Sequence, residues 1–172
     1  MSRALFSLIS VLILAGCASN DLPQVFTPYL DEDFQVWKGA GNANLTGQAF
    51  FKMPSGRVIS CAGSMISLVP ATGYNLEAEQ SIGMGKGYPE NYNKSAFKYV
   101  RKVMCDGAGH FSFQNVPANN WIVLTHISWQ QPSSYMFWSK SDEGGTLYQE
   151  VLLEPGDNKI VLSNQDYVED NN

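Results

Sequence analysis

A chain of 172 residues, 44% of them hydrophobic, is long enough to bury one core, so we expect a single domain. Its formal net charge of −5, without basic runs, argues against nucleic acid as a partner. The same balance argues against electrostatic attachment to anionic lipid. Any membrane attachment must therefore come from another feature of the chain.

The N-terminus has the layout of an export signal. A basic start over residues 1–3 leads into an apolar stretch, residues 4–16, that ends in Ala15 and Gly16 directly before Cys17. Small residues before a cleavage point are typical of exported proteins. The stretch has thirteen residues, whereas a membrane-spanning helix needs about 20. We therefore predict a signal peptide over residues 1–16 rather than a transmembrane anchor.

The segment Leu14-Ala15-Gly16-Cys17 resembles the lipobox of bacterial lipoproteins. The resemblance implies cleavage before Cys17, lipidation of Cys17, and attachment to the membrane through acyl chains, of which two or more give a stable anchor. Ala18 follows the cysteine and resembles the residue found in lipoproteins sorted to the outer membrane of Gram-negative bacteria. The alternative is an ordinary secretory signal in which Cys17 has no special role.

If Cys17 carries lipid, Cys61 and Cys105 remain. An even number of cysteines in an oxidising compartment predicts a disulfide. The loop it would close, about 44 residues, corresponds to a stabilisation on the order of 4 kcal/mol. Two free buried thiols are the alternative. A metal site is disfavoured because neither cysteine lies in a Cys-x-x-Cys spacing.

The rest of the chain predicts an all-β domain over residues 41–163. Residues 17–40 are expected to form the lipidated cysteine and a polar tether, and residues 164–172 a flexible acidic tail. A short helix is expected over residues 75–82, followed by a surface loop over residues 83–95.

Strands alternating with turn signals indicate a single antiparallel β-sandwich of about seven strands. They are predicted over residues 45–51, 58–61, 65–69, 97–105, 110–113, 121–129, 147–153 and 159–162; the last two flank a hairpin signature at residues 154–158.

The run from Asp106 through Gly109, Phe111 and Phe113, followed by a hydrophobic strand, resembles the carboxypeptidase regulatory-like domains. The match extends from residue 47 to residue 162 when residues 71–96 are set aside. It implies a transthyretin-like sandwich and a non-catalytic module for stabilisation, spacing or interaction. One departure is Asn119-Asn120-Trp121, where the family favours Gly-x-Tyr; asparagine tolerates the left-handed backbone.

An aromatic segment is the candidate binding site. Trp129, Tyr135, Phe137 and Trp138 lie close together in the sequence. If residues 130–145 form a loop, these rings are exposed at one end of the sandwich, where contact patches are often found. The alternative is that they continue a strand and pack in the core.

Reactive-site motifs are lacking. The two histidines, His110 and His126, lie in predicted strands next to aromatic residues and outside any His-x-His or His-Glu-x-x-His motif, so we interpret them as surface or partly packed strand residues. We therefore expect no enzyme, no catalytic residue, no metal and no cofactor. The first prediction for function is a membrane-anchored envelope lipoprotein that acts as a structural or protein-interaction module on an unidentified envelope protein. The alternative is a lipoprotein that binds a glycan or other ligand through the aromatic segment.

Overall fold

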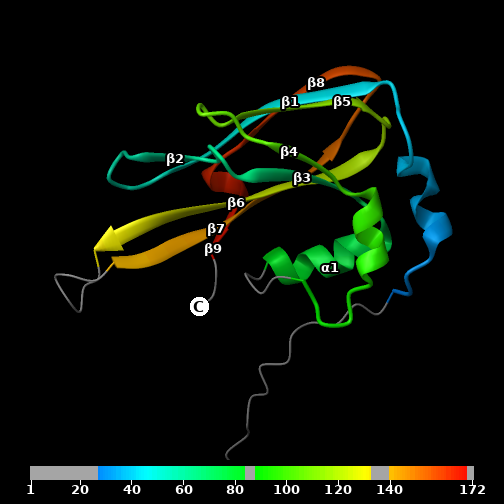
Figure 1. Ribbon diagram of the computed structural model, residues 1–172, viewed down its shortest axis with the longest axis horizontal. Coiled ribbons are helices and arrows are strands. Elements are labelled where there is room, and N and C mark those ends of the chain that lie inside the picture. The colour runs from blue at the N-terminus through cyan, green and yellow to red at the C-terminus, as the bar shows by residue number, and fades with distance from the viewer. Residues whose placement is uncertain (1–26, 84–87, 133–139, 170–172) are drawn as a thin grey trace, which may run out of the picture.

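The computed structural model describes residues 27–83, 88–132 and 140–169. Within these ranges, nine strands form two sheets that pack face to face (Figure 1). The predicted all-β sandwich is therefore confirmed. Residues 1–26, which include the predicted signal peptide and Cys17, lie outside the described part of the chain. No helix in the described ranges is long and apolar enough to cross a membrane.

The four-stranded sheet is built around one central strand, β1. It pairs antiparallel with β2 and β5 and parallel with β8. The strands are β1 (Ala43–Lys52), β2 (Val58–Ser60), β5 (His110–Val116) and β8 (Gly156–Leu162). The parallel pair departs from a purely antiparallel sandwich. Two parallel strands need a long connection between them. Most of the domain lies between β1 and β8 and supplies that connection.

The five-stranded sheet is antiparallel throughout and has the order β4-β3-β6-β7-β9. Its strands are β3 (Met65–Pro70), β4 (Arg101–Met104), β6 (Asn120–Pro132), β7 (Lys140–Leu152) and β9 (Tyr167–Glu169). The hairpin predicted at residues 154–158 is wrong. The turn is present, but it carries the chain from one sheet to the other, so that β8 pairs with β1 and not with β7.

The sandwich core lies between the sheets and follows the two-residue period of the strands. Leu45 and Ala49 of β1 and Phe111 and Phe113 of β5 are buried on one face. The Phe111 and Phe113 rings meet edge to face, with centroids 6.2 Å apart, an arrangement that aromatic pairs favour. Trp121, predicted to occupy the family's aromatic position, is fully buried in the same core.

Close packing and turn geometry explain several small residues around β1 and β5. A Cβ atom at Gly47 would lie 2.4 Å from the Phe111 ring, so only glycine fits there. Gly109 has a φ of 80°, as expected for the turn before β5. The asparagine with a left-handed backbone is Asn115, with a φ of 54°. From the sequence, a left-handed backbone was expected instead at residues 119 and 120.

The predicted disulfide is present. Cys61 follows β2 and Cys105 follows β4, and their sulfur atoms are bonded, with Cα atoms 5.8 Å apart. Because β2 and β4 belong to different sheets, the bond joins the two layers of the sandwich. Both cysteines are buried within the sandwich core.

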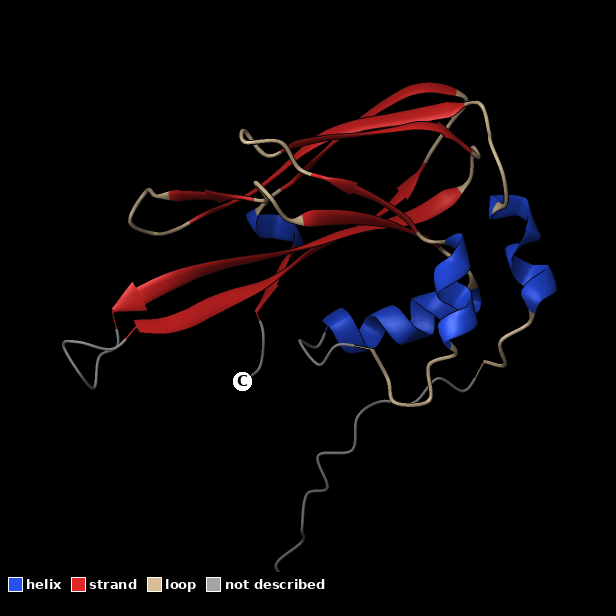
Figure 2. Ribbon diagram, viewed as in Figure 1, coloured by secondary structure: helices blue, strands red, loops and turns tan. Residues whose placement is uncertain are grey.

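Three helical segments gather at one end of the sandwich (Figure 2). They are η1 (Asp31–Trp37), α1 (Gly73–Gly83) and η2 (Lys94–Tyr99). We call this region the helical end. Its buried side chains form a second cluster, separate from the sandwich core and mostly aromatic: Phe34, Tyr74, Ala78, Tyr92, Ala96 and Tyr99. The predicted helix at residues 75–82 is confirmed within α1.

The strand predicted over residues 97–105 begins later than expected. Residues up to Tyr99 belong to η2, and β4 starts at Arg101. The Asn93 side chain caps η2 by accepting a hydrogen bond from the Ser95 amide at 2.9 Å, a local interaction that competes with an extended backbone. Part of the predicted surface loop also folds inward, because Tyr92 is buried against α1.

Both flanks of the predicted domain contain regular structure. Residues 31–37, assigned to the tether by the sequence, form η1 and bury Phe34 and Trp37. At the other flank, η3 (Asn164–Asp166) is stabilised by a capping box between Ser163 and Asp166. β9 then pairs with β7.

Candidate ligand-binding site

Of the four residues in the predicted aromatic segment, one, Trp129, belongs to the part of the chain that the structure describes. Tyr135, Phe137 and Trp138 lie outside the described residues. Trp129 lies on β6, and its ring stacks on Phe51 of β1 with centroids 5.4 Å apart and planes 6° apart. Trp129 is therefore half-buried and packs against the sandwich core, as in the core alternative stated above.

The hypothesis that residues 130–145 form a loop is wrong for the residues that the structure describes, and the strand alternative holds there. β6 continues through residue 132, and β7 begins at residue 140. The two strands pair without a break, from residue 120 opposite residue 152 to residue 132 opposite residue 140. A long regular hairpin therefore replaces most of the loop. The run of Asp142, Glu143, Gly144 and Gly145 carries turn-forming residues, but pairing with β6 makes it a strand.

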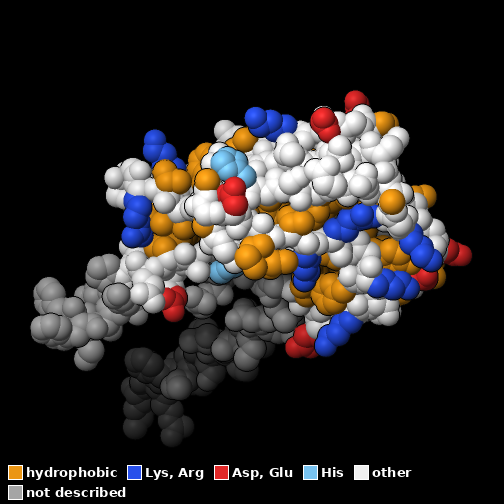
Figure 3. Space-filling model, turned by 45° about the horizontal axis from the view of Figure 1, so that its top comes forward, with side chains coloured by type: hydrophobic (Ala, Val, Ile, Leu, Met, Phe, Trp, Pro, Cys, Tyr) orange, Lys and Arg blue, Asp and Glu red, His pale blue; other side chains and the backbone are white. Residues whose placement is uncertain are grey.

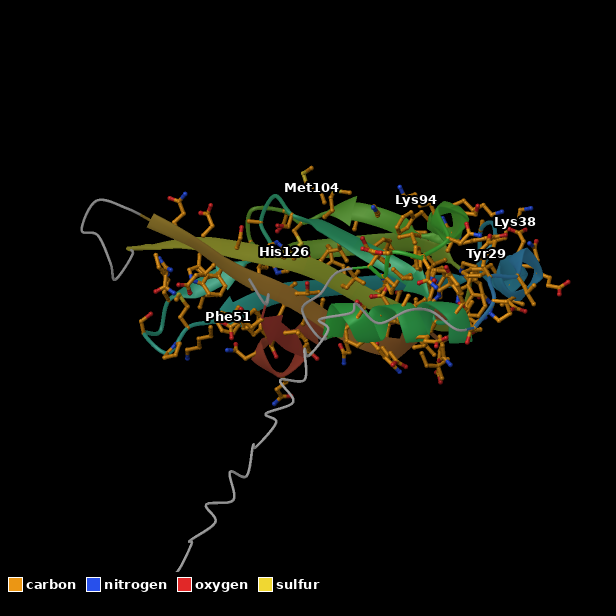
Figure 4. The ribbon with its side chains drawn as sticks, turned by 90° about the horizontal axis from the view of Figure 1, so that it is seen from below. Tyr29, Lys38, Phe51, Lys94, Met104 and His126 are labelled. Atoms are coloured by element: carbon orange, nitrogen blue, oxygen red, sulfur yellow. A yellow bond between two sulfur atoms is a disulfide. The ribbon has the colours of Figure 1, made fainter. Side chains whose placement is uncertain are left out.

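The opposite end of the molecule contains a hollow of about 560 Å³ between η1, η2 and the start of β4. Figure 4 shows Lys38 and Lys94 at this end, away from Phe51. We call this hollow the cationic hollow. It is lined by two large aromatic side chains, three basic side chains, one carboxylate and two smaller residues: Asp31, Trp37, Lys38, Gly39, Lys98, Tyr99, Val100 and Arg101.

The aromatic residues of the cationic hollow are firmly held. Trp37 is 9% exposed, and its indole N–H donates to the Asn120 carbonyl oxygen at 2.8 Å. Tyr99 is 7% exposed, and its ring stacks on Phe34 with centroids 4.9 Å apart. The Tyr99 hydroxyl accepts a hydrogen bond from the Gln35 amide at 3.0 Å. These contacts fix the walls of the hollow before any ligand binds.

An ion pair lies on one side of the hollow. The Lys98 ammonium donates to the Asp31 carboxylate, which also accepts a hydrogen bond from the Tyr29 hydroxyl at 2.8 Å. The hydrogen bond from Lys98, followed by that from Tyr29, lowers the pKa of Asp31 to about 2. The hydrogen bond with Asp31 in turn raises the pKa of Lys98 to about 12. Asp31 therefore neutralises Lys98 across the physiological pH range.

The other two cations have no carboxylate partner among the described residues. The Arg101 guanidinium donates to the Gly39 carbonyl oxygen and to the Asn115 carbonyl oxygen at 3.4 Å. It also lies 5.8 Å from the centroid of the Trp121 ring. Lys38 follows η1, and its exposed ammonium has no hydrogen-bond partner in the described part of the chain. Two positive charges thus remain available to a ligand.

A second hollow, of about 550 Å³, lies beside the end of β6 near Trp129. It is lined by residues from the β1–β2 turn and by two glutamines: Met53, Pro54, Ser55, Arg57, Gln130 and Gln131. We call it the glutamine hollow. It contains one cation, Arg57, and no residue with an aromatic ring.

Within the helical end, one carboxyl group is buried. Glu79 of α1 is 1% exposed, and burial raises its pKa to about 7. Its Oε1 accepts a hydrogen bond from the Tyr88 hydroxyl at 3.2 Å, while its Oε2 has no partner among the described residues. Nearby, the Tyr92 hydroxyl donates to the Asn75 side chain at 2.8 Å. This group is enclosed and does not line either hollow.

The two histidines lie on different strands, β5 and β6. The Nδ1 of His110, the first residue of β5, lies 3.4 Å from the carboxylate of Asp106, and His126 is exposed on β6. In the described ranges, no group of three or more His, Cys, Asp or Glu side chains is placed to hold a metal ion.

Sequence reasoning did not identify the cationic hollow. Its residues come from two segments about 60 residues apart, and the first segment was assigned to the tether. The spacing of Lys98, Arg101 and Lys102 is a weak local signal, since three basic residues within five are unusual in an acidic chain. Nothing in the sequence indicates that Lys38 joins them.

The comparisons with known proteins bear on the fold. No family model matches the chain, and no curated protein matches its sequence. A crystal structure from Pseudomonas aeruginosa, described as a "putative carbohydrate binding protein", is similar with a TM-score of 0.69 and 19% sequence identity. The similarity covers 80% of this chain and 99% of that one. The β-sandwich thus belongs to a fold already seen in a solved structure.

Proposed function

We propose that this protein is a non-enzymatic, saccharide-binding lipoprotein of the cell envelope, and that saccharides bind in the cationic hollow. The observation that carries the proposal is the lining of that hollow, which combines rigid aromatic rings with charged groups that can bind hydroxyls. Ligand sites usually combine apolar walls with a few placed polar groups. The fold shared with the protein described as a "putative carbohydrate binding protein" supports the same function.

Binding to a panel of glycans tests the proposal. The detergent-solubilised full chain is screened, and bound glycans are then titrated while the amide and indole N–H signals are followed by NMR. We expect the Trp37 indole signal to shift, because that indole lines the cationic hollow. Shifts confined to the Gln130 and Gln131 side-chain amides would move the site to the glutamine hollow and the predicted aromatic segment. Binding of no glycan in the panel would contradict the function itself.

The membrane anchor is a separate part of the proposal. It rests on the lipobox resemblance of residues 14–17 and on Ala18, which favours the outer membrane. Replacing Cys17 with serine removes the thiol that would carry lipid. We expect Cys17→Ser to leave the membrane fraction or to remain uncleaved, as judged by fractionation and by mass. A processed, membrane-bound variant would contradict lipidation.

Docking on another envelope protein remains a second candidate function, favoured by one exposed pair of side chains. Met65 of β3 and Met104 of β4 are opposite each other in the register and are 44% and 64% exposed. β4 is an edge strand, and Figure 4 shows Met104 at the surface. Exposed apolar side chains at a sheet edge are typical of contact surfaces.

Crosslinking in intact cells tests this second function. A photoreactive residue at position 104 should capture a specific envelope protein, and Met65→Glu should abolish that capture. Val161→Glu, which changes an exposed apolar residue on β8 of the other sheet, is the matched control. Capture that is equal in all three proteins would argue against a docking surface at β4.

A further inference from the structure

The cationic hollow carries positive charge in an acidic protein. The whole chain has a formal net charge of −5, whereas the hollow combines three cations with the single carboxylate of Asp31. Figure 3 shows Lys and Arg side chains grouped over this end of the molecule. Clustered charge of one sign in a concave site concentrates ligands of the opposite sign. The charge of the hollow therefore restricts which saccharides it favours.

The two cations without a carboxylate partner are held near each other. Arg101 donates to the carbonyl of Gly39, the residue directly after Lys38, so its guanidinium lies beside the backbone that carries the Lys38 side chain. A guanidinium has five N–H donors, and the contacts to Gly39 and Asn115 are made by the two terminal nitrogens. Donors of Arg101 therefore remain for a ligand, in the same hollow that Lys38 lines.

We infer that the hollow selects acidic saccharides of the hexuronate type, with the sugar carboxylate bound by Lys38 and Arg101. The inference rests on the proposed saccharide-binding function and adds the substrate class. Trp37 and Val100 supply the apolar wall against which the sugar ring packs. Lys98 contributes less to the anion, because Asp31 already neutralises it. Hydrogen bonds between charged partners are the strong ones in such sites.

Matched ligands separate this inference from the proposed function. Trigalacturonate and trimannuronate are titrated by calorimetry against their methyl esters, which keep the sugar ring and remove the charge. We expect at least one acid to bind about tenfold more tightly than its ester, a difference that corresponds to about 1.4 kcal/mol. Lys38→Gln should weaken binding of that acid about tenfold and so remove most of its advantage over the ester.

The control variant is Lys159→Gln, which removes an exposed lysine from β8 in the other sheet. It should bind both ligands like the wild type. Equal binding of acid and ester would overturn the inference while leaving saccharide binding intact. Equal losses in Lys38→Gln and Lys159→Gln would overturn it as well, since the effect would then be one of overall charge. Absence of binding to these and to all other glycans would overturn both proposals.

Discussion

The two hydrophobic clusters of this molecule differ in composition and in what they leave at the surface. The sandwich core contains aliphatic side chains from both sheets, together with phenylalanine and tryptophan rings, and is crossed by the disulfide. The helical-end cluster contains tyrosines whose hydroxyls reach polar partners, among them Asn75 and Glu79. Hydroxyls buried with partners cost little, whereas a buried carboxyl without a full set of partners is costly.

This difference suits the two regions to different roles, the sandwich core to stability and the helical end to the proposed binding of a ligand. The backbone groups of the strands pair within the two sheets, and the side chains between the sheets are mostly apolar. The sandwich core therefore has few polar groups to offer a ligand. The helical end is built from short segments whose backbones diverge, and charged residues of η1, η2 and β4 converge in the space between them. We conclude that the sandwich serves as a scaffold and that the helical end carries the candidate site.

The largest expected effect comes from removing the disulfide that ties the layers of the sandwich. The bond closes a loop with a sequence separation of 44, for which loop-closure entropy gives about 4 kcal/mol. We expect the double variant Cys61→Ser, Cys105→Ser to lose about that much free energy of unfolding in urea. Alkylation of the unfolded, unreduced wild type should add no group at these two cysteines. An unchanged urea midpoint in the double variant would contradict this role.

The next effect concerns Glu79 and distinguishes the helical end from the sandwich core. Burial raises the pKa of Glu79 from 4.5 to about 7, so the folded state holds this proton more tightly than the unfolded state does. The stability that the neutral form provides is complete below pH 4.5 and is lost as pH rises to about 7. The total loss is about 3 kcal/mol, because each unit of pKa corresponds to about 1.4 kcal/mol.

Glu79→Gln keeps the shape of the side chain and removes its proton equilibrium. We expect this variant to flatten the fall in stability between pH 4.5 and 7 and to unfold at higher urea than the wild type at pH 8. Glu154→Gln, at an exposed turn between β7 and β8, is the matched control and should retain the wild-type profile. A wild-type profile in Glu79→Gln would show that the helical end contributes no pH-dependent stability.

The smallest effect lies at the surface of the helical end. Asp31→Asn removes the partner of Lys98 and frees a third cation in the cationic hollow. We expect binding of the acidic trisaccharide to tighten about threefold, the scale of a single exposed charge. Glu32→Gln, an exposed neighbour on η1 that does not line the hollow, controls for overall charge. Weaker binding in Asp31→Asn would mean that Asp31 positions Lys98 for the ligand.

The local pattern of the chain was sufficient for the main features of the fold. Phe111 and Phe113 share a face because side chains alternate along a strand, and both are buried as that alternation predicts. Gly109 adopts the turn geometry expected before them. The pairing of Cys61 with Cys105 followed from counting cysteines, although it depended on assigning Cys17 to lipid.

The candidate site could not be found in this way. The sequence left two alternatives for Trp129, exposure at the surface or packing in the core, and in the structure it stacks on Phe51, a partner contributed by the other sheet. Whether an aromatic side chain is covered depends on what packs against it, and that partner is distant in the sequence. For the same reason, composition placed η1 in a tether, although Phe34 has a buried place among the tyrosines of α1 and η2.

Most of the strand-forming segments and the helix at residues 75–82 could be predicted from the chain alone, because each depends on the spacing of nearby residues. The cysteine pair followed from the number of cysteines. The parallel pairing of β8 with β1 and the position of Lys38 and Arg101 at one hollow are seen only in the folded molecule. Those features are contacts between distant segments. Their free energy depends on which surfaces meet in the folded chain, and no local pattern contains that information.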